Sequence, residues 1–181
     1  DRPGRNQALK GVDIILNPSA SHFAFSKIEI RKRFVIEGSR AFSIGYIYAN
    51  LLGNEAGRAI YDGGALIATE GKLIADGERF SFKDYMITTA YIDVTKNRMI
   101  QARTASYRPE ITEEIQGLVY YDFDYPKVES YSNNDILKEG WESSNYLKEE
   151  EFTRALTLAL FDYLRKSYSN GFVVSLSGGA D

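Results

Sequence analysis

Val12-Asp13-Ile14-Ile15-Leu16-Asn17-Pro18 predicts the first buried strand of an α/β fold. Most of its apolar residues are β-branched, which suits a strand that is covered on both faces. A proline has no N–H group to offer a neighbouring strand, so we expect the strand to end at Asn17-Pro18. The segments that follow alternate between helical and strand patterns, as an α/β architecture requires.

A helix is expected over about residues 27–43. Ile30, Phe34 and Ala41 mark its predicted apolar face, and Arg31-Lys32-Arg33 falls mostly on the opposite face. We interpret this basic triplet as a solvated helix face rather than as a binding patch.

Further elements complete the predicted α/β unit. They are a buried strand at 46–51, a hairpin of strands at 65–69 and 72–75, a strand at 86–94 and a short polar helix at about 95–103. Glu70-Gly71 supplies the two-residue turn of the hairpin. Asp13 and Asp62 are interpreted as turn or strand-edge carboxylates.

Residues 104–147 show no sustained period and contain the acidic, aromatic run 120–125. A free linker would hold fewer aromatic residues, so we expect an ordered connector with Trp141 docked on a neighbouring surface; a disordered linker is the alternative. The clearest helix follows at 148–168. Its apolar residues recur at helical spacing and are numerous enough to predict cover on more than one side. They are Phe152, Ala155, Leu156, Leu158, Ala159, Leu160, Phe161, Tyr163 and Leu164.

The final segment, 172–181, predicts a buried strand that runs into a glycine turn. Two glycines free the backbone so that amide N–H groups can converge on a phosphate, and a helix N-terminus is expected next. Ser177 adds a hydroxyl, and the Asp181 carboxylate could hold Mg²⁺ on the phosphates. An ordinary strand-ending turn is the alternative.

Composition excludes several classes of function. A net charge of −3 gives no indication of a nucleic-acid partner. No apolar run is long enough to cross a membrane. We expect a cytoplasmic protein. The chain has no Cys, which excludes disulfides, thiolate zinc sites and a thiol nucleophile within it. His22, the single His, supports neither a metal site nor a Ser-His pair.

Ser177-Gly178-Gly179-Ala180-Asp181 resembles the start of the ATP-pyrophosphatase loop of NAD, GMP and asparagine synthetases. The pattern in those families continues with a further serine, which is not present here. Because the chain stops inside this pattern and does not start with Met, we expect it to be a segment of a longer polypeptide.

Asn17-Pro18-Ser19-Ala20-Ser21-His22-Phe23, followed by Lys27, is similar to the segment after the nucleophile in the nitrilase-type amidase domain of glutamine-dependent NAD synthetases. Residues 61–67 and 74–80 resemble the same domain, and residues 167–172 resemble the beginning of the synthetase domain. An amidase part followed by an ATP loop separates this family from GMP and asparagine synthetases, whose glutaminase domains are unrelated.

The resemblance implies an α/β fold in three parts. Residues 1–103 would be the C-terminal part of a nitrilase-like α-β-β-α sandwich that serves as the glutaminase domain, and 104–147 would be an interdomain connector. Residues 148–181 would supply the first helix and strand of a doubly wound, Rossmann-like ATP-pyrophosphatase domain.

The resemblance also implies the reaction. Glutamine is hydrolysed to ammonia, ATP adenylates deamido-NAD with the help of Mg²⁺, and ammonia displaces AMP to give NAD; a homo-oligomer is expected. Ser21 and Lys27 match positions that contact glutamine, and the ATP-binding residues would be Ser177, Gly178, Gly179 and Asp181, with Asp181 also binding the metal. The Cys, Glu and Lys of the amidase triad lie outside this chain, so we expect the segment alone to be inactive.

Two other interpretations remain open at this stage. One is a segment of a free-standing carbon–nitrogen hydrolase (amidase), in which the final glycines form only a turn. The other is a non-catalytic, nitrilase-like scaffold that lost its thiol.

Overall fold

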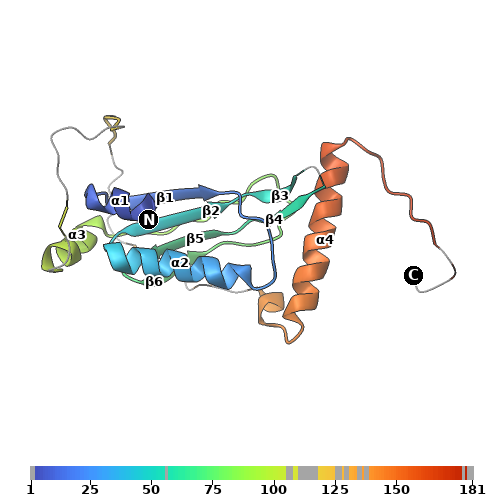
Figure 1. Ribbon diagram of the computed structural model, residues 1–181, viewed down its shortest axis with the longest axis horizontal. Helices are drawn as coiled ribbons and strands as arrows, with labels where there is room; N and C mark the ends of the chain where they lie inside the picture. The colour runs from blue at the N-terminus through green and yellow to red at the C-terminus, as the bar shows by residue number, and fades with distance from the viewer. Residues whose placement is uncertain are drawn as a thin grey trace.

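The computed structural model describes residues 3–55, 57–104, 108–109, 118–124, 128, 131–133, 136, 139–176 and 178. These residues form a mixed α/β structure with a four-stranded sheet in the order β1-β2-β5-β6 and a separate two-stranded sheet of β3 and β4 (Figure 1). The strands are β1 Ile14–Ser19, β2 Gly45–Asn50, β3 Leu52–Glu55, β4 Ala59–Asp62, β5 Ala65–Thr69 and β6 Lys72–Asp76. The helices are α1 Pro3–Leu9, α2 Lys27–Phe42, α3 Val94–Arg103, the 3-10 helix η1 Gly140–Ser143 and α4 Leu147–Lys166.

The four-stranded sheet combines one parallel pair with two antiparallel pairs. β1 and β2 are parallel and are connected by α2, so their carboxyl ends, Ser19 and Asn50, lie side by side. β2 pairs antiparallel with β5, and β5 with β6. The predicted β5–β6 hairpin is confirmed, and its turn residues Glu70 and Gly71 have φ angles of 53° and 74°, as a tight two-residue turn requires.

Strand β1 lies at the edge of this sheet, which corrects the prediction of a fully buried strand. Ile15 is buried, whereas Ile14 is 39% exposed and Leu16 is 70% exposed. The strand also continues through Pro18 to Ser19 instead of ending at Asn17-Pro18. An edge strand tolerates proline because one of its sides needs no N–H donor.

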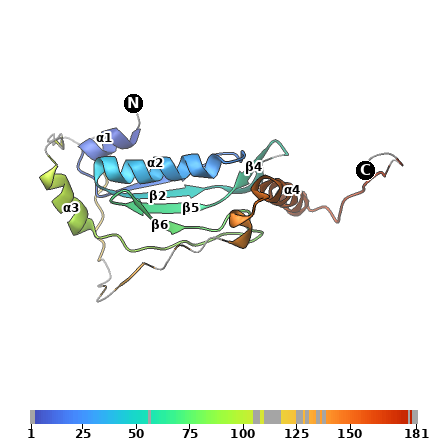
Figure 2. The ribbon, with the colours of Figure 1, turned by 90° about the horizontal axis from the view of Figure 1, so that it is seen from below.

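Helix α2 covers one face of the sheet over the predicted range, but the face that it buries is not the predicted one (Figure 2). Ile30 and Phe34 are 50% and 53% exposed, while Arg31 is buried beside Val35. Gly38 explains the rotation, because a Cβ atom there would lie 2.9 Å from the Tyr46 ring. The absence of that atom lets the helix approach the sheet along this side, which forms the core with Tyr48 and other residues. The core cluster is Ile28, Val35, Tyr48, Leu66 and Ala68.

The opposite face of the sheet is covered by the extended segment that runs from β6 to α3 (Figure 2). The predicted strand at 86–94 is wrong, since residues 85–93 have no strand pairing. They contribute side chains instead: a Cβ atom on Gly45 would lie 2.8 Å from Ile92 Cδ1. The polar helix expected next is confirmed as α3, and its N-terminus is capped by Asp93, which accepts a hydrogen bond from the Lys96 N–H.

Helix α4 packs against the β3–β4 hairpin, which the sequence analysis did not predict (Figure 1). A second core cluster forms there from Phe80, Trp141, Ala155 and Leu158. The helix range is confirmed, but the prediction of cover on more than one side is wrong for the described residues. Phe152, Leu156 and Leu160 are half-exposed. The face that docks carries Glu151, whose partner is Arg79, and Asp162, which accepts the Asn54 N–H of β3.

Asp162 fixes the far end of α4 to strand β3. Its Oδ2 accepts the Asn54 N–H at 2.7 Å, and its carboxylate pairs with Arg165 at 2.7 Å and with Lys166 at 2.6 Å. Burial opposes ionisation, but hydrogen bonds from Lys166, Asn54 and Arg165 outweigh it and hold the pKa of Asp162 below its usual value. The approach is so close that a Cβ atom on Gly53, at φ +114°, would lie 2.4 Å from Asp162 Oδ2.

The remaining segments have little regular structure. Of the connector's described residues, 140–143 form η1; Trp141 is buried, as expected, whereas Tyr120 and Tyr121 are exposed. The strand predicted at the start of 172–181 is wrong: residues 171–176 have no strand structure, and Val173 is 99% exposed. No strand of the described part of the chain lies beside them to supply hydrogen-bond partners (Figure 1). Among the described helices, none is both long and apolar enough to span a bilayer.

We predict that Gly53→Ala destabilises the chain by more than Gly57→Ala. Both residues have a positive φ, but a Cβ on Gly57 meets nothing within 4 Å, whereas one on Gly53 collides with Asp162. The Gly57 variant should therefore lose about 1 kcal/mol from backbone strain alone, and the Gly53 variant about 3 kcal/mol or more. Urea unfolding measures both losses. Equal losses would show that α4 does not need this close approach.

Candidate functional site

Polar side chains gather at the carboxyl ends of the parallel strands β1 and β2. Asn17 Nδ2 donates to the Tyr46 hydroxyl at 3.0 Å, and Ser19 Oγ donates to Asn17 Oδ1 at 3.0 Å. The Tyr48 hydroxyl donates to Asn50 Oδ1 at 3.3 Å. Ligands of parallel sheets bind at this end of the strands, so the set marks the first candidate region.

A groove of about 520 Å³ opens beside this set, between α1, α2 and β1. Its walls are mostly apolar, and Asn17 and Tyr46 supply its polar end. The lining includes Leu16, Asn17, Phe34, Gly38, Phe42 and Tyr46. The volume falls in the range of small-molecule sites, but the groove lies away from Ser21 and was not predicted from the sequence.

Ser21 lies in the loop between β1 and α2, and its backbone is held on both sides. Its N–H donates to Asn50 Oδ1 at 2.8 Å, and its carbonyl accepts from Asn50 Nδ2 at 3.0 Å and from Arg31 Nη2 at 2.7 Å. Because the backbone is fixed by β2 and α2, the Ser21 side chain has a defined position. Its hydroxyl lies near Tyr48, whose pKa is raised by burial although Arg31 and the hydroxyls of Ser21 and Ser19 oppose the shift.

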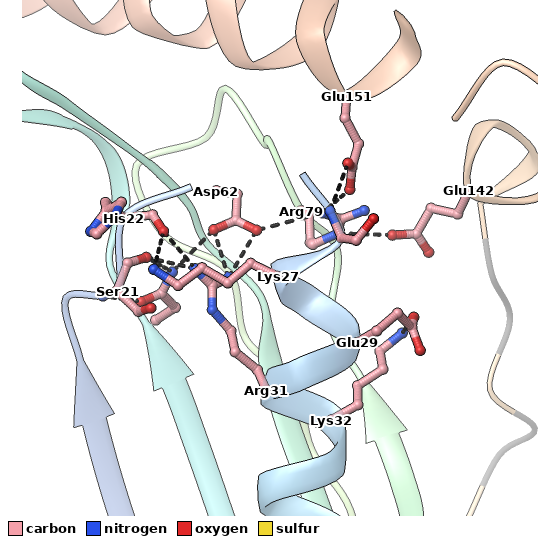
Figure 3. Close-up of polar contacts among 12 residues, drawn as sticks. Ser21, His22, Lys27, Glu29, Arg31, Lys32, Asp62, Arg79, Glu142 and Glu151 are labelled. Carbon is pink, nitrogen blue, oxygen red and sulfur yellow. Dashed lines mark hydrogen bonds and ion pairs between the residues drawn. The ribbon is translucent and has the colours of Figure 1, made fainter. Parts of the chain in front are cut away.

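Lys27, the other predicted glutamine contact, starts α2 at the end of the same loop. Its Nζ donates to the His22 carbonyl at 2.9 Å (Figure 3). The structure therefore brings Ser21 and Lys27 together on one loop of seven residues, 21–27. His22 is exposed and contributes its carbonyl, which also accepts from Arg31 Nη2 at 3.2 Å.

Asp62 lies at the end of β4, as expected for a strand-edge carboxylate, but it is also a buried hub, which we did not predict. Its two oxygens accept from Arg31 Nη1 at 2.7 and 2.9 Å, and Oδ1 also accepts from Asn50 Nδ2 at 3.2 Å (Figure 3). Arg31 is 5% exposed, which corrects the prediction that the whole basic triplet faces solvent. Lys32 also departs from that prediction, since it pairs with Asp76 of β6 at 2.6 Å.

Arg79 extends the network from Asp62 to η1 and α4. Its Nη1 lies 3.5 Å from Asp62 Oδ2 and donates to Glu151 Oε1 at 2.9 Å, while its Nε donates to Glu142 Oε1 at 3.0 Å. Its guanidinium lies 4.9 Å from the Trp141 ring centroid. Burial disfavours the cation, but the hydrogen bonds and charges of Glu142 and Glu151 prevail and raise the pKa of Arg79.

The network as a whole is suited to positioning and not to proton transfer. Each carboxylate in it lies within ion-pair distance of an arginine. Within the described residues, no group of three His, Cys, Asp or Glu side chains could hold a metal ion. The predicted ATP-binding and metal residues Ser177, Gly179 and Asp181 lie outside the described residues, and Gly178 is in a turn.

The sequence analysis missed Arg31, Asp62, Arg79 and Glu151. A signal for Arg31 was present, because its spacing from Ile28 and Val35 places it on their helix face, and a buried arginine requires an acidic partner. Neither Asp62 nor Arg79 stands in a period that indicates such pairing. Glu151 follows two other glutamates near the start of its helix, and nothing in that run distinguishes it as buried.

Comparisons with known proteins agree on one family. A putative glutamine-dependent NAD(+) synthetase of Schizosaccharomyces pombe is 34% identical over 99% of this chain and 26% of its own length. The glutamine-dependent NAD(+) synthetase of Mus musculus is 32% identical over 99% of this chain and 25% of its own length. No protein-family model matches the chain.

Solved structures give the same result. The crystal structure of a glutamine-dependent NAD(+) synthetase from Cytophaga hutchinsonii matches with 41% identity and a TM-score of 0.60, over 95% of this chain and 21% of that one. The structure of the enzyme from Acinetobacter baumannii in complex with ADP matches with 18% identity and a TM-score of 0.55, over 90% of this chain and 23% of that one, which supports the fold alone.

The chain spans about a quarter of the length of the curated relatives that it matches. Within that span the similarity extends over nearly every residue, from the α/β unit through α4. Over nearly its whole length, this chain is similar to one part of the glutamine-dependent NAD(+) synthetases.

Proposed function

We propose that this chain is part of an ATP-dependent amide ligase that converts deamido-NAD to NAD with ammonia from glutamine. The observation that carries the proposal is the match over 99% of the chain to proteins named glutamine-dependent NAD(+) synthetase. A carboxylate does not react with ammonia until it has a good leaving group, which adenylation by ATP would supply. Residues elsewhere in the complete enzyme would provide the thiol nucleophile, since this chain has no Cys.

In the proposed domain arrangement, residues 1–103 belong to a nitrilase-like glutaminase domain, residues 104–147 to a connector and residues 148–181 to the start of the ATP-binding domain. The regular α/β unit from α1 to α3 is consistent with the first part, and η1 with Trp141 belongs to the second. Since α4 packs on β3 and β4, the first and third parts would share an apolar and ionic contact.

Ser21 and Lys27 are the proposed contacts to glutamine. Support comes from the loop geometry, in which Asn50 and Arg31 hold the Ser21 backbone while the side chain stays part-exposed. Such anchoring keeps the Ser21 hydroxyl, which lies near Tyr48, in a defined position, as a substrate contact requires. Lys27 would add a cationic group within the same loop.

Ser177, Gly178, Gly179 and Asp181 are the proposed ATP contacts, with Mg²⁺ on Asp181. The proposal is supported by the sequence pattern of two glycines followed by an acidic residue. Glycines let backbone amides approach phosphates, and a carboxylate is a hard oxygen ligand that suits Mg²⁺. The metal would neutralise the charge that develops as pyrophosphate leaves.

We predict that Ser21→Ala in the complete enzyme weakens glutamine use and spares ammonia use. Loss of one hydrogen bond of about 0.5–1.5 kcal/mol should raise the KM for glutamine by about two- to tenfold. NAD formation with each nitrogen donor measures the effect, and Ser143→Ala, at an exposed serine of η1, is the control. An equal loss with both donors would make Ser21 a structural residue.

We also predict that Asp181→Asn abolishes NAD formation with either donor and leaves glutamine hydrolysis intact. Neutralising a metal ligand should weaken the metal–ATP complex, whereas Ser177→Ala removes only one neutral hydrogen bond and should be milder. Deamido-NAD-dependent synthesis is measured across a Mg²⁺ titration, with Asp124→Asn at an exposed position as the control. Near-normal synthesis by Asp181→Asn at low Mg²⁺ would rule out this turn as the nucleotide site.

A further inference from the structure

The loop of residues 21–27 is held at two points, one by the adjoining helix α2 and one by α4, which is distant in sequence. At its start, Arg31 binds the carbonyls of Ser21 and His22 at 2.7 and 3.2 Å. Near its end, the Ser26 N–H points to Glu151 Oε2 of α4 at 3.5 Å, across 125 residues of sequence. Ser26 has a left-handed backbone, with φ 60°, which orients this N–H outward from the start of α2.

The two anchors are connected by one continuous set of charged groups, which we call the charge chain. It consists of Glu151, Arg79, Asp62 and Arg31, in that order. Figure 3 shows it running from α4 past the end of β4 to α2. Each of the four side chains is at most 5% exposed, so water cannot replace a lost partner.

Asp62 is the residue through which a displacement of α4 would affect Arg31. Its Oδ2 is shared between Arg31, at 2.9 Å, and Arg79, at the longer distance of 3.5 Å. Arg79 is drawn away from Asp62 by Glu151 at 2.9 Å and Glu142 at 3.0 Å. Without the Glu151 charge, Arg79 would move toward Asp62 and compete with Arg31, which in turn holds the loop.

We propose that the charge chain couples the docking of α4 to the conformation of the loop 21–27. Its members are positioning residues: with α4 docked, Arg31 is held in the orientation that fixes the Ser21 and His22 carbonyls. The consequence for glutamine rests on the proposed function, in which Ser21 and Lys27 contact that substrate. Use of free ammonia, which needs no such loop, is independent of the coupling.

Hydrogen exchange of the complete enzyme tests the coupling without any assay of activity. Glu151→Gln should speed exchange of the Ser21 and Phe23 amides, which bond to Asn50 and Ile60, by about tenfold. Glu149→Gln is the matched control, because it removes the same charge from the same turn of α4 at an exposed position. Unchanged loop exchange in Glu151→Gln, whether or not the exchange of α4 changes, would overturn the proposal.

A second variant covers the case in which Glu151→Gln fails to fold. Arg79→Lys keeps the charge, but one ammonium cannot reach Asp62, Glu142 and Glu151 together. The same faster exchange of the loop is expected, and normal loop exchange in this variant would overturn the proposal equally.

Kinetics of the complete enzyme separate this inference from the proposed function. Glu151→Gln should raise the KM for glutamine by about tenfold and leave ammonia-dependent NAD formation at the level of Glu149→Gln. A loosened loop with an unchanged KM would refute the glutamine role of the loop, while the coupling itself would stand. If the complete enzyme without any substitution forms no NAD from either glutamine or ammonia, the proposed function is refuted, regardless of the hydrogen-exchange results.

Discussion

The buried pairing of Arg31 with Asp62 is the interaction on which the arrangement of this molecule depends. A charge in an interior of low dielectric constant requires a partner, and each of these residues requires the other. Arg31 belongs to α2. Asp62 belongs to β4, a strand of the hairpin against which α4 packs. The parallel β1–α2–β2 unit and the β3–β4 hairpin are therefore fixed relative to each other by an ion pair as well as by apolar contact.

Such a pair contributes more to geometry than to net stability. Desolvation of two charges offsets much of their attraction, whereas removing one partner costs about 3–5 kcal/mol because the other remains buried. Stability comes from the two apolar clusters, one around Tyr48 and Leu66 and one around Trp141 and Leu158. Arginine suits the role because its planar group can bind Asp62 and two loop carbonyls at once, which a lysine could not do.

The sequence predicted those elements whose pattern is local. The ranges of α2 and α4 follow from helical spacing, and the β5–β6 hairpin follows from its Glu-Gly turn. The rotation of α2 could not be read in the same way, because Gly38 acts through its contact with Tyr46 on another element. Residues 86–94 and 172–176 have strand composition, but a strand also needs a neighbour, and composition does not report one. The Ser21–Lys27 loop was found through a family resemblance. Of its buried supports, only Arg31 carried a local signal, and the others depend on tertiary contacts.

The exposed side of β1 has a consequence for how the isolated chain behaves in solution. Ile14 and Leu16 stand beside backbone groups that no other described strand pairs with, and such an edge is a template for a strand of another molecule. Pro18 limits the hazard, because it interrupts the row of N–H donors near the end of the strand. Self-association of this chain at high concentration would therefore begin at residues 14–16, and a lysine in place of Leu16 would act as a gatekeeper against aggregation.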